Sequence, residues 1–98
     1  MDDESILEID EYENKFWRNK KNQVHRLDGP SIILTNGYKQ WNINDVLHRE
    51  DGPAIIYSNG FKKWYLNGCF YKTKEDWFDA LSDEAKAKCL FSEDFLNG

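Results

Sequence analysis

Apolar and polar residues alternate on both sides of two Asn-Gly pairs, Asn36-Gly37 and Asn59-Gly60. Such a pair between strand-forming residues is a strong signal for a β-hairpin, because both residues tolerate a positive φ. With Asn59 and Gly60 as a two-residue loop, Ile55 is predicted to face Trp64 across the hairpin. The apolar stripes predicted on one face are Ile32, Leu34, Trp41 and Ile43 in the first hairpin, and Ile55, Tyr57, Trp64 and Leu66 in the second.

The two hairpins belong to a longer internal repeat. Residues 25–45 read HRLDGPSIILTNGYKQWNIND and residues 48–68 read HREDGPAIIYSNGFKKWYLNG, with a constant offset of 23 positions. Phe16-Trp17 before the first copy and Tyr71 after the second indicate partial copies on either side. The predicted repeat region therefore extends from residue 12 to residue 72.

Further turn residues separate the predicted strands. Asp28-Gly29-Pro30 and Asp51-Gly52-Pro53 interrupt the chain between hairpins, because proline cannot donate to a β ladder. Asn44-Asp45 and Asn67-Gly68 accept left-handed backbone geometry and mark second turns. The prediction is a mainly β, α+β domain: an antiparallel meander of tandem β-hairpin repeats with about five to seven short strands, followed by a C-terminal helical tail.

After residue 72 the apolar spacing becomes that of a helix. Thr73 followed by Asp76 is a capping pair, and Ser82 can cap a second segment, so residues 73–92 are expected to form one broken helix or two short ones. The apolar positions of this tail are Trp77, Phe78, Leu81, Ala85 and Cys89. They are expected to lie over the tryptophan stripe and to close the open side of the sheet.

The composition fits one small domain rich in aromatic residues. A chain of 98 residues predicts a single domain over residues 1–98 and argues against a two-lobed enzyme. Phe, Trp and Tyr make up 15% of the chain, so large aromatics must supply much of the core. The predicted core residues are Ile32, Trp41, Ile55, Trp64, Trp77 and Leu81.

The net charge of −5 is distributed in blocks. Residues 1–13 carry seven acids and no base, residues 14–40 carry six bases and one acid, and residues 74–98 carry seven acids and three bases. Acidic ends, including an acidic N-terminal segment over residues 1–11, therefore flank a mildly basic middle. Such ends either keep the protein in solution or form a docking surface for a basic partner.

Cysteine usage and hydropathy bear on location. No apolar run reaches the roughly 20 residues that span a bilayer, and the N-terminus lacks the pattern of a signal peptide, so a cytoplasmic protein with no membrane partner is expected. Cys69 and Cys89 share no CxxC or metal-ligand spacing. We interpret both as free thiols that pack in the interior.

The repeat unit is similar to a known family. A unit of 23 residues that forms a hairpin with an Asn-Gly turn followed by an aromatic resembles the MORN repeat, and IIYSNGFKKWYLNG resembles its bacterial variant. The His-Arg-x-Asp-Gly-Pro segment resembles a motif of small bacteriophage repeat proteins. The resemblance covers residues 14–81 and implies an interaction scaffold, such as an inhibitor or antitoxin-like protein in a host cytoplasm. The Asp-Gly-Pro segments and the few copies depart from the usual MORN pattern, so lipid binding is not carried over.

The candidate chemistry is sparse. His25 with Asp28, and His48 with Asp51, are the acid/base pairs that repeat. The same pair in each repeat favours a structural role, with the aspartate pairing to the turn backbone or to the neighbouring arginine. The chain has no evident nucleophile or phosphate-cradling glycine loop, and two imidazoles alone make a poor metal site. We therefore expect no enzyme activity, no metal and no cofactor.

Two functional hypotheses remain. In the first, the chain binds and blocks a host protein, with contacts from His25, Arg26, Asp28, Tyr38, His48, Arg49, Asp51 and Phe61. In the second, the sheet aromatics and a basic middle bind a nucleotide or single-stranded nucleic acid, which the net negative charge disfavours. The bases of that middle are Arg18, Lys20, Lys21, Arg26, Lys39, Lys62 and Lys63. Self-association through open strand edges is a third alternative.

Overall fold

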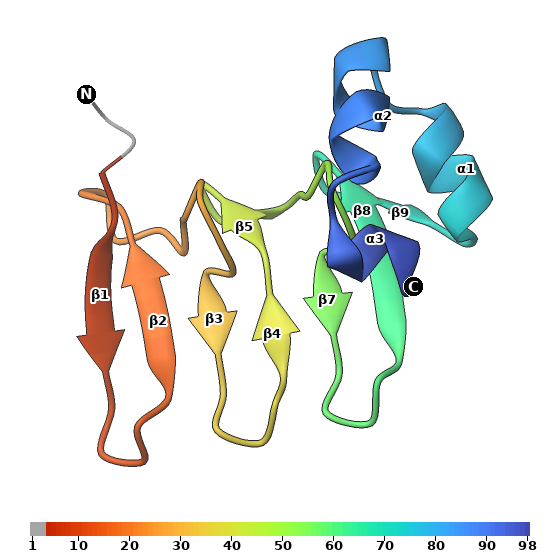
Figure 1. The fold of residues 1–98 in the computed structure, drawn as a ribbon. Helices are drawn as coiled ribbons and strands as arrows, with labels where there is room; N and C mark the ends of the chain where they lie inside the picture. Colours follow the sequence, from red (N-terminus) through yellow and green to blue (C-terminus); the bar gives the residue numbers. More distant parts are fainter. Residues whose placement is uncertain (1–3) are drawn as a thin grey trace.

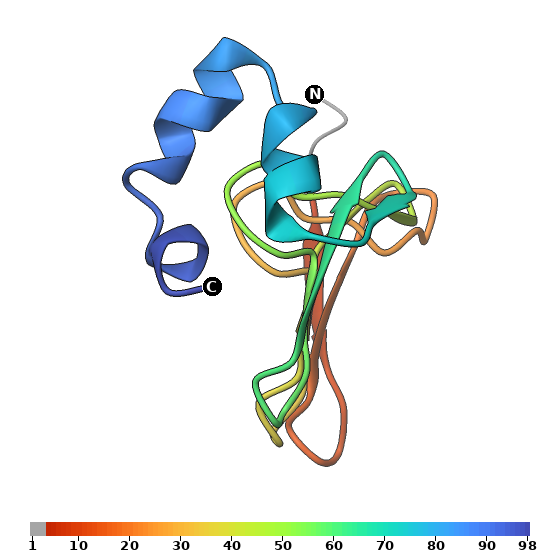
Figure 2. The ribbon, with the colours of Figure 1, turned by 90° about the vertical axis from the view of Figure 1, so that its right-hand side faces the viewer.

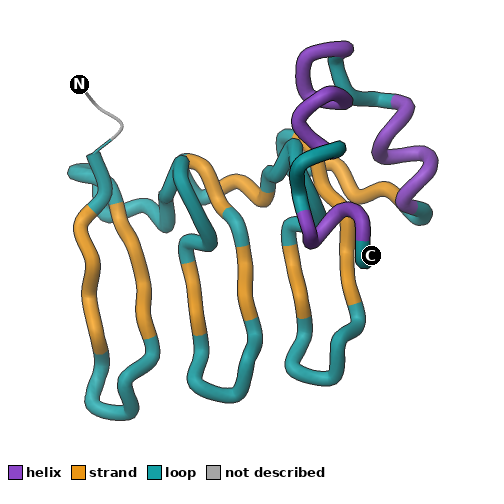
Figure 3. The backbone as a smooth tube through the Cα atoms, in the orientation of Figure 1, coloured by secondary structure: helices purple, strands orange, loops and turns teal. Residues whose placement is uncertain are grey.

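The computed structural model describes residues 4–98 and is mainly β, with three short helices near the C-terminus (Figures 1 and 3). Within these residues, seven strands form an antiparallel sheet in the order β1-β2-β3-β4-β7-β8-β9, and β5 pairs with β6 in a separate ladder. The elements are β1 (Ile6–Ile9), β2 (Lys15–Arg18), β3 (Ile32–Ile33), β4 (Lys39–Gln40), β5 (Asn42–Ile43), β6 (Val46–Leu47), β7 (Ile55–Ile56), β8 (Lys62–Leu66), β9 (Cys69–Tyr71), α1 (Lys74–Asp79), α2 (Asp83–Cys89) and α3 (Glu93–Leu96).

The acidic N-terminal segment contributes a strand to this sheet. Asp2 and Asp3 of the segment lie outside the described residues. Strand β1 pairs with β2, and Glu8 accepts a charged hydrogen bond from Arg18 Nε at 3.0 Å. An acid of the N-terminal block therefore contacts a base of the following block across one hairpin.

The register of the two Asn-Gly hairpins is one residue away from the predicted register. Ile55 lies opposite Lys63 instead of Trp64. Tyr57 N–H donates to the Phe61 carbonyl at 2.8 Å, so the loop has three residues, and within it the glycine has a φ of 90°. A three-residue loop with a left-handed glycine is the next most common hairpin connection after the two-residue loop. Since side chains alternate along a strand, Ile55 and Trp64 point to opposite faces, and the predicted common stripe was wrong.

The second turns are the ones that adopt two-residue left-handed geometry. The φ values are 50° and 69° at Asn44 and Asp45, and 50° and 82° at Asn67 and Gly68, as the sequence predicted. These turns connect β5 to β6 and β8 to β9. Each turn hydrogen-bonds to the segment that lies 21 positions earlier: Asp45 N donates to the Val24 carbonyl and Gly68 N to the Leu47 carbonyl, both at 2.8 Å. Residues from successive repeat units therefore meet there.

The helical tail begins as the sequence predicts and then adds an unpredicted helix. Thr73 Oγ1 accepts from Asp76 N at 3.0 Å to cap α1, and Ser82 Oγ accepts from Ala85 N at 3.1 Å to cap α2. Helix α3 follows Ser92, beyond the predicted limit of the tail. All three helices gather at the β7–β9 end of the sheet and lie on one side of it (Figures 1 and 2).

The tail forms the main apolar core with the last long hairpin. The ring centroids of Trp64 and Trp77 are 4.7 Å apart, and α1 contacts β8 and β9. The buried residues of this cluster are Trp64, Leu66, Trp77, Leu81, Ala85 and Cys89. The tail therefore covers the Trp64 end of the sheet, whereas Trp17 lies outside the cluster and is half-buried.

Other predicted interior positions differ in burial. Trp41 and Ile55 are buried, whereas Ile32 is only half-buried. Both cysteines are free thiols, but Cys69 is exposed on strand β9, so its predicted packing role was wrong; Cys89 is fully buried. Among residues 4–98, the helices are too short and too polar to cross a bilayer.

Candidate functional site

Each Asp-Gly-Pro segment follows an arginine that stacks on a tryptophan of the preceding hairpin. The guanidinium carbon of Arg26 lies 3.9 Å from the Trp17 ring centroid. The equivalent distance from Arg49 to Trp41 is 3.8 Å. An arginine over an indole face within about 6 Å is a favourable cation–π contact. The chain reverses between each tryptophan and its arginine, and the histidine before the arginine donates its backbone N–H to the tryptophan carbonyl. This pairing brings the arginine side chain close to the indole ring.

Hydrogen bonds fix each guanidinium in its own segment. Arg26 donates from Nε to Asp28 and from Nη1 to the Pro30 carbonyl, at 3.0 and 3.2 Å. The equivalent bonds 23 positions later measure 2.8 and 3.1 Å. The glycine between aspartate and proline leaves room for the guanidinium, because a Cβ on Gly29 would lie 2.9 Å from the arginine Cζ, and one on Gly52 would lie 2.8 Å from it. In the Asp-Gly-Pro sequence, the aspartate and the proline carbonyl thus bind the guanidinium, and the glycine leaves space for it.

The repeated histidines contact the second turns and not the aspartates. His25 Nδ1 accepts a hydrogen bond from Asn44 N at 3.0 Å, and His48 Nδ1 accepts one from Asn67 N at 2.9 Å. His25 is 1% exposed, so its ring does not reach the surface. The Nε2 atom of His48 lies 3.6 Å from Oε2 of Glu50. The candidate His–Asp pairs of the sequence are therefore not the contacts that these histidines make.

The two arginine segments form the walls of a cleft with a volume of about 490 Å³. Helices α2 and α3 contribute to its rim through Lys88 and Asp94. The basic residues that line it are Arg26, Lys39, Arg49 and Lys88, and the acidic ones are Asp28, Glu50, Asp51 and Asp94. Leu27, Trp41 and Ile43 add apolar surface. Five of the predicted contact residues line this cleft: Arg26, Asp28, His48, Arg49 and Asp51.

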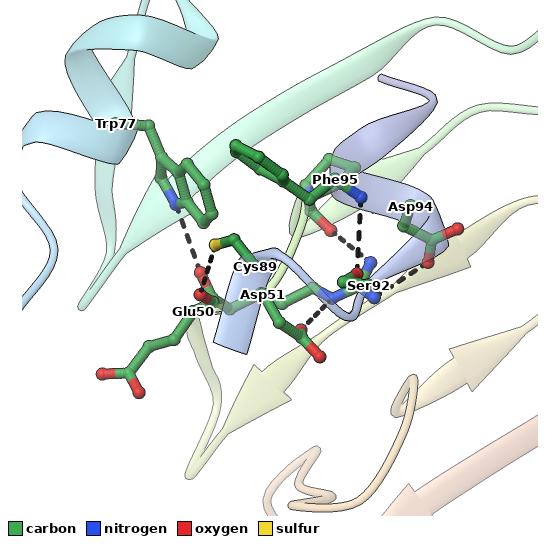
Figure 4. A network of polar contacts seen from close by, with 9 residues as sticks. Glu50, Asp51, Trp77, Cys89, Ser92, Asp94 and Phe95 are labelled. Atoms are coloured by element: carbon green, nitrogen blue, oxygen red, sulfur yellow. Dashed lines mark hydrogen bonds and ion pairs between the residues drawn. The ribbon is translucent and has the colours of Figure 1, made fainter. Parts of the chain in front are cut away.

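The tail closes the second arginine segment, as Figure 4 shows. Asp94 Oδ2 accepts from Arg49 Nη2 at 2.8 Å. Trp77 Nε1 donates to the Arg49 carbonyl at 3.2 Å, and the buried Cys89 thiol donates to the Glu50 carbonyl at 3.5 Å. Burial raises the pKa of Cys89, and nearby Asp51 adds to this rise, so the thiol keeps the proton that it donates. The Arg49 side chain is consequently only 9% exposed.

Of the three remaining predicted contact residues, His25 is buried beneath the surface, whereas Tyr38 and Phe61 belong to a different surface. Their rings flank Tyr57, with centroid distances of 5.6 Å to Tyr38 and 5.8 Å to Phe61. The Nζ atom of Lys63 lies 5.7 Å from the centroid of the Tyr57 ring. Because Lys63 and Trp64 are consecutive strand residues, this aromatic cluster lies on the face away from the helices. Burial raises the pKa of Tyr38, and the neighbouring tyrosines add to the rise.

Sequence reasoning missed part of the cleft. Asp94 is 45 positions from Arg49, and no repeat or motif links them. The stacking of each arginine on a tryptophan was also missed, although the sequence contains a signal. The arginine of each full repeat follows a tryptophan of the preceding unit by eight or nine residues, with turn residues between them. Lys39 and Lys88 lack any such pattern.

Comparisons of this chain with protein-family models, with curated proteins and with solved structures found no match. Across residues 4–98, no group of three or more His, Cys, Asp or Glu side chains is arranged to hold a metal ion. The contacts of the chain itself therefore define the site: two arginine stacks beside one cleft, the second of them closed by the tail.

Proposed function

We propose that the chain is a non-enzymatic protein-binding module and that the cleft between the two arginine segments is its binding site. The observation that carries this proposal is the fixed geometry of the arginines, each held by a tryptophan ring, an aspartate and a backbone carbonyl. Arginine and tryptophan are frequent anchors of protein interfaces, and a side chain that is already ordered loses little entropy on binding.

The charge of the cleft supports a protein partner. Four bases and four acids line it, so its formal charge is balanced. A polyanion entering the cleft would approach the acids as closely as the bases, whereas a peptide segment can offer both charges together with apolar atoms. The exposed Leu27 adds an apolar contact at the cleft wall.

The same contacts recur 23 positions apart, which supports a tandem, MORN-like repeat over residues 12–72 as the scaffold of this module. Following the resemblance to small bacteriophage proteins, we propose inhibition of a host protein as the consequence of binding. Blocking requires affinity and shape and no catalytic group, and the histidines of the two segments serve the backbone of turns.

A comparative affinity purification tests the proposed function. Three baits are compared: the full chain, the cleft variant Leu27→Glu, and the variant Phe61→Ser on the opposite face. Both substituted residues are exposed, Leu27 at 53% and Phe61 at 60%. We expect a bacterial protein that is enriched by the native chain and by Phe61→Ser but not by Leu27→Glu. The purified partner should then bind in a calorimeter with the same order of affinities. Loss of the partner only with Phe61→Ser would remove the cleft from the proposal.

A second candidate function rests on the cluster of Tyr38, Tyr57 and Phe61. Stacked aromatic rings with a nearby lysine, Lys63, are a feature of surfaces that bind single-stranded nucleic acid. Binding of an oligonucleotide should weaken steeply as salt is raised, whereas binding of a protein in the charge-balanced cleft should change little. Recovery of nucleic acid by the bait, lost with Phe61→Ser, would favour this second candidate.

A further inference from the structure

The two arginine segments have the same internal guanidinium contacts, but the tail contacts only the second segment. In both, Nε binds an aspartate and Nη1 binds a proline carbonyl. The Nη2 atom of Arg49 binds Asp94, but within residues 4–98 no carboxylate takes that place beside Arg26. The Arg26 side chain is 22% exposed and lines the cleft. Within residues 4–98, the Nη2 atom of Arg26 therefore has no hydrogen-bond acceptor, and it is not buried.

The chain itself shows what such a position accepts. Asp94 lies in the first turn of α3, whose N-cap is Ser92, and the next residue is aromatic. Phe95 packs against Trp77 and Phe78, with centroid distances of 6.0 and 5.3 Å. The recognised element is thus a carboxylate on a short helix, followed by an aromatic residue that enters an apolar neighbourhood.

The surroundings of Arg26 offer a positive donor beside apolar surface. Leu27, next to it, is 53% exposed and gives apolar surface. Lys39, which also lines the cleft, adds positive charge. A charge-assisted hydrogen bond to a carboxylate is roughly twice as strong as a neutral one, and a donor that is already ordered makes it at a small entropic cost.

We propose that Arg26 receives a carboxylate from a short helix of a protein partner, in the way that Arg49 receives Asp94. This inference rests on the proposed protein-binding function and names the chemistry of the partner: an aspartate or glutamate followed by an aromatic residue. The acids around the cleft disfavour a phosphate, which carries more negative charge than a carboxylate. A second copy of the chain is disfavoured because Asp94 is already bound to its own Arg49 and Phe95 already packs on Trp77.

A peptide titration tests the proposal. The probe is a synthetic peptide of residues 82–98 of this chain, added under reducing conditions to the full-length ¹⁵N-labelled protein, and the matched control peptide carries Asp94→Asn. We expect saturable shifts of the Arg26 Nε–H and Leu27 amide signals, with the signals of Arg49 unchanged. The control peptide should bind about tenfold more weakly or worse, because it lacks one charged hydrogen bond.

Two protein variants and one further ligand complete the test. Leu27→Glu should abolish the shifts by repelling the carboxylate. Phe70→Ser, at an exposed residue that packs on Tyr65 on the face away from the helices, should preserve them. Equal binding of both peptides, shifts confined to Arg49, or no shift at millimolar peptide would each overturn the proposal. Stronger binding of inorganic phosphate at Arg26 than of the peptide would overturn it in favour of a phosphoryl ligand. If the peptide fails while a purified partner still depends on Leu27, the carboxylate proposal alone fails and the protein-binding function stands.

Discussion

Replacing Gly52 by alanine tests whether the arginine stack contributes to stability. A Cβ at this position would lie 2.8 Å from Arg49 Cζ and also 2.8 Å from its Nη1, so the guanidinium must move. The displaced group is the end of a flexible side chain, and the steric cost itself is small. The cost arises because moving it breaks the bonds to Asp51 and Asp94 and weakens the stack on Trp41.

The magnitude follows from these contacts. A hydrogen bond to a charged group is worth about 1.5–3 kcal/mol, and a partly desolvated cation–π contact about 1–2 kcal/mol. Partial re-formation in a shifted position recovers some of this sum, so we expect Gly52→Ala to lower the free energy of unfolding by about 2–4 kcal/mol. For Gly29→Ala we expect about 1–2 kcal/mol, because Arg26 is more exposed and lacks the contact that Asp94 makes with Arg49.

Urea denaturation followed by tryptophan fluorescence and by far-UV circular dichroism measures both values. Neither glycine has a positive φ, so backbone strain does not contribute to the difference. Combining Gly52→Ala with Asp94→Asn provides a double-mutant cycle: the cost of Asp94→Asn should shrink once Arg49 has been displaced. Equal losses for the two glycine variants, or additive losses in the cycle, would contradict the role given to the tail.

Three further outcomes are expected. His25→Ala leaves the Asn44 N–H without its acceptor and a cavity in the interior, and should destabilise the fold by about 2–4 kcal/mol in the same urea assay. Asn67→Ala, at a φ of 50°, should cost about 1–2 kcal/mol, whereas Asn67→Gly should cost less, as thermal unfolding would show. An alkylating reagent should modify Cys69 in the native protein and Cys89 only after unfolding, as judged by peptide mass spectrometry, because burial shields Cys89 and raises its pKa.

The hairpins could be predicted from the sequence, but their register could not. Each first strand contains two consecutive isoleucines, such as Ile55-Ile56. A slip of one residue then exchanges one isoleucine for the other on a given face, so the apolar pattern does not choose between the two registers. The loop makes the choice: Asn59 Oδ1 accepts from Phe61 N at 3.0 Å, and the three-residue loop needs a left-handed residue only at its glycine.

The site divides in the same way between local and distant contacts. The pairing of Asp28 with Arg26 spans two residues, so the repeated sequence already indicates it. The contact between Asp94 and Arg49 spans 45 positions and depends on where a four-residue helix comes to lie. Helix α3 carries a serine cap and two acids in its first turn, which are recognisable start signals, but four residues are too few for a periodic apolar pattern.

The tail gives two nearly identical segments different roles. At Arg49, three contacts from the tail bury the segment, and the arginine there joins the sheet to the helices. At Arg26 the same local geometry is built, but the contact that would complete it is left to another molecule in our proposal. The Arg26 side chain is ordered by its own segment and partly exposed to solvent, so it loses little conformational entropy when it binds a partner. The repeated sequence thus supplies the geometry twice, and the position of one helix decides which arginine binds the tail and which one, in our proposal, binds a partner.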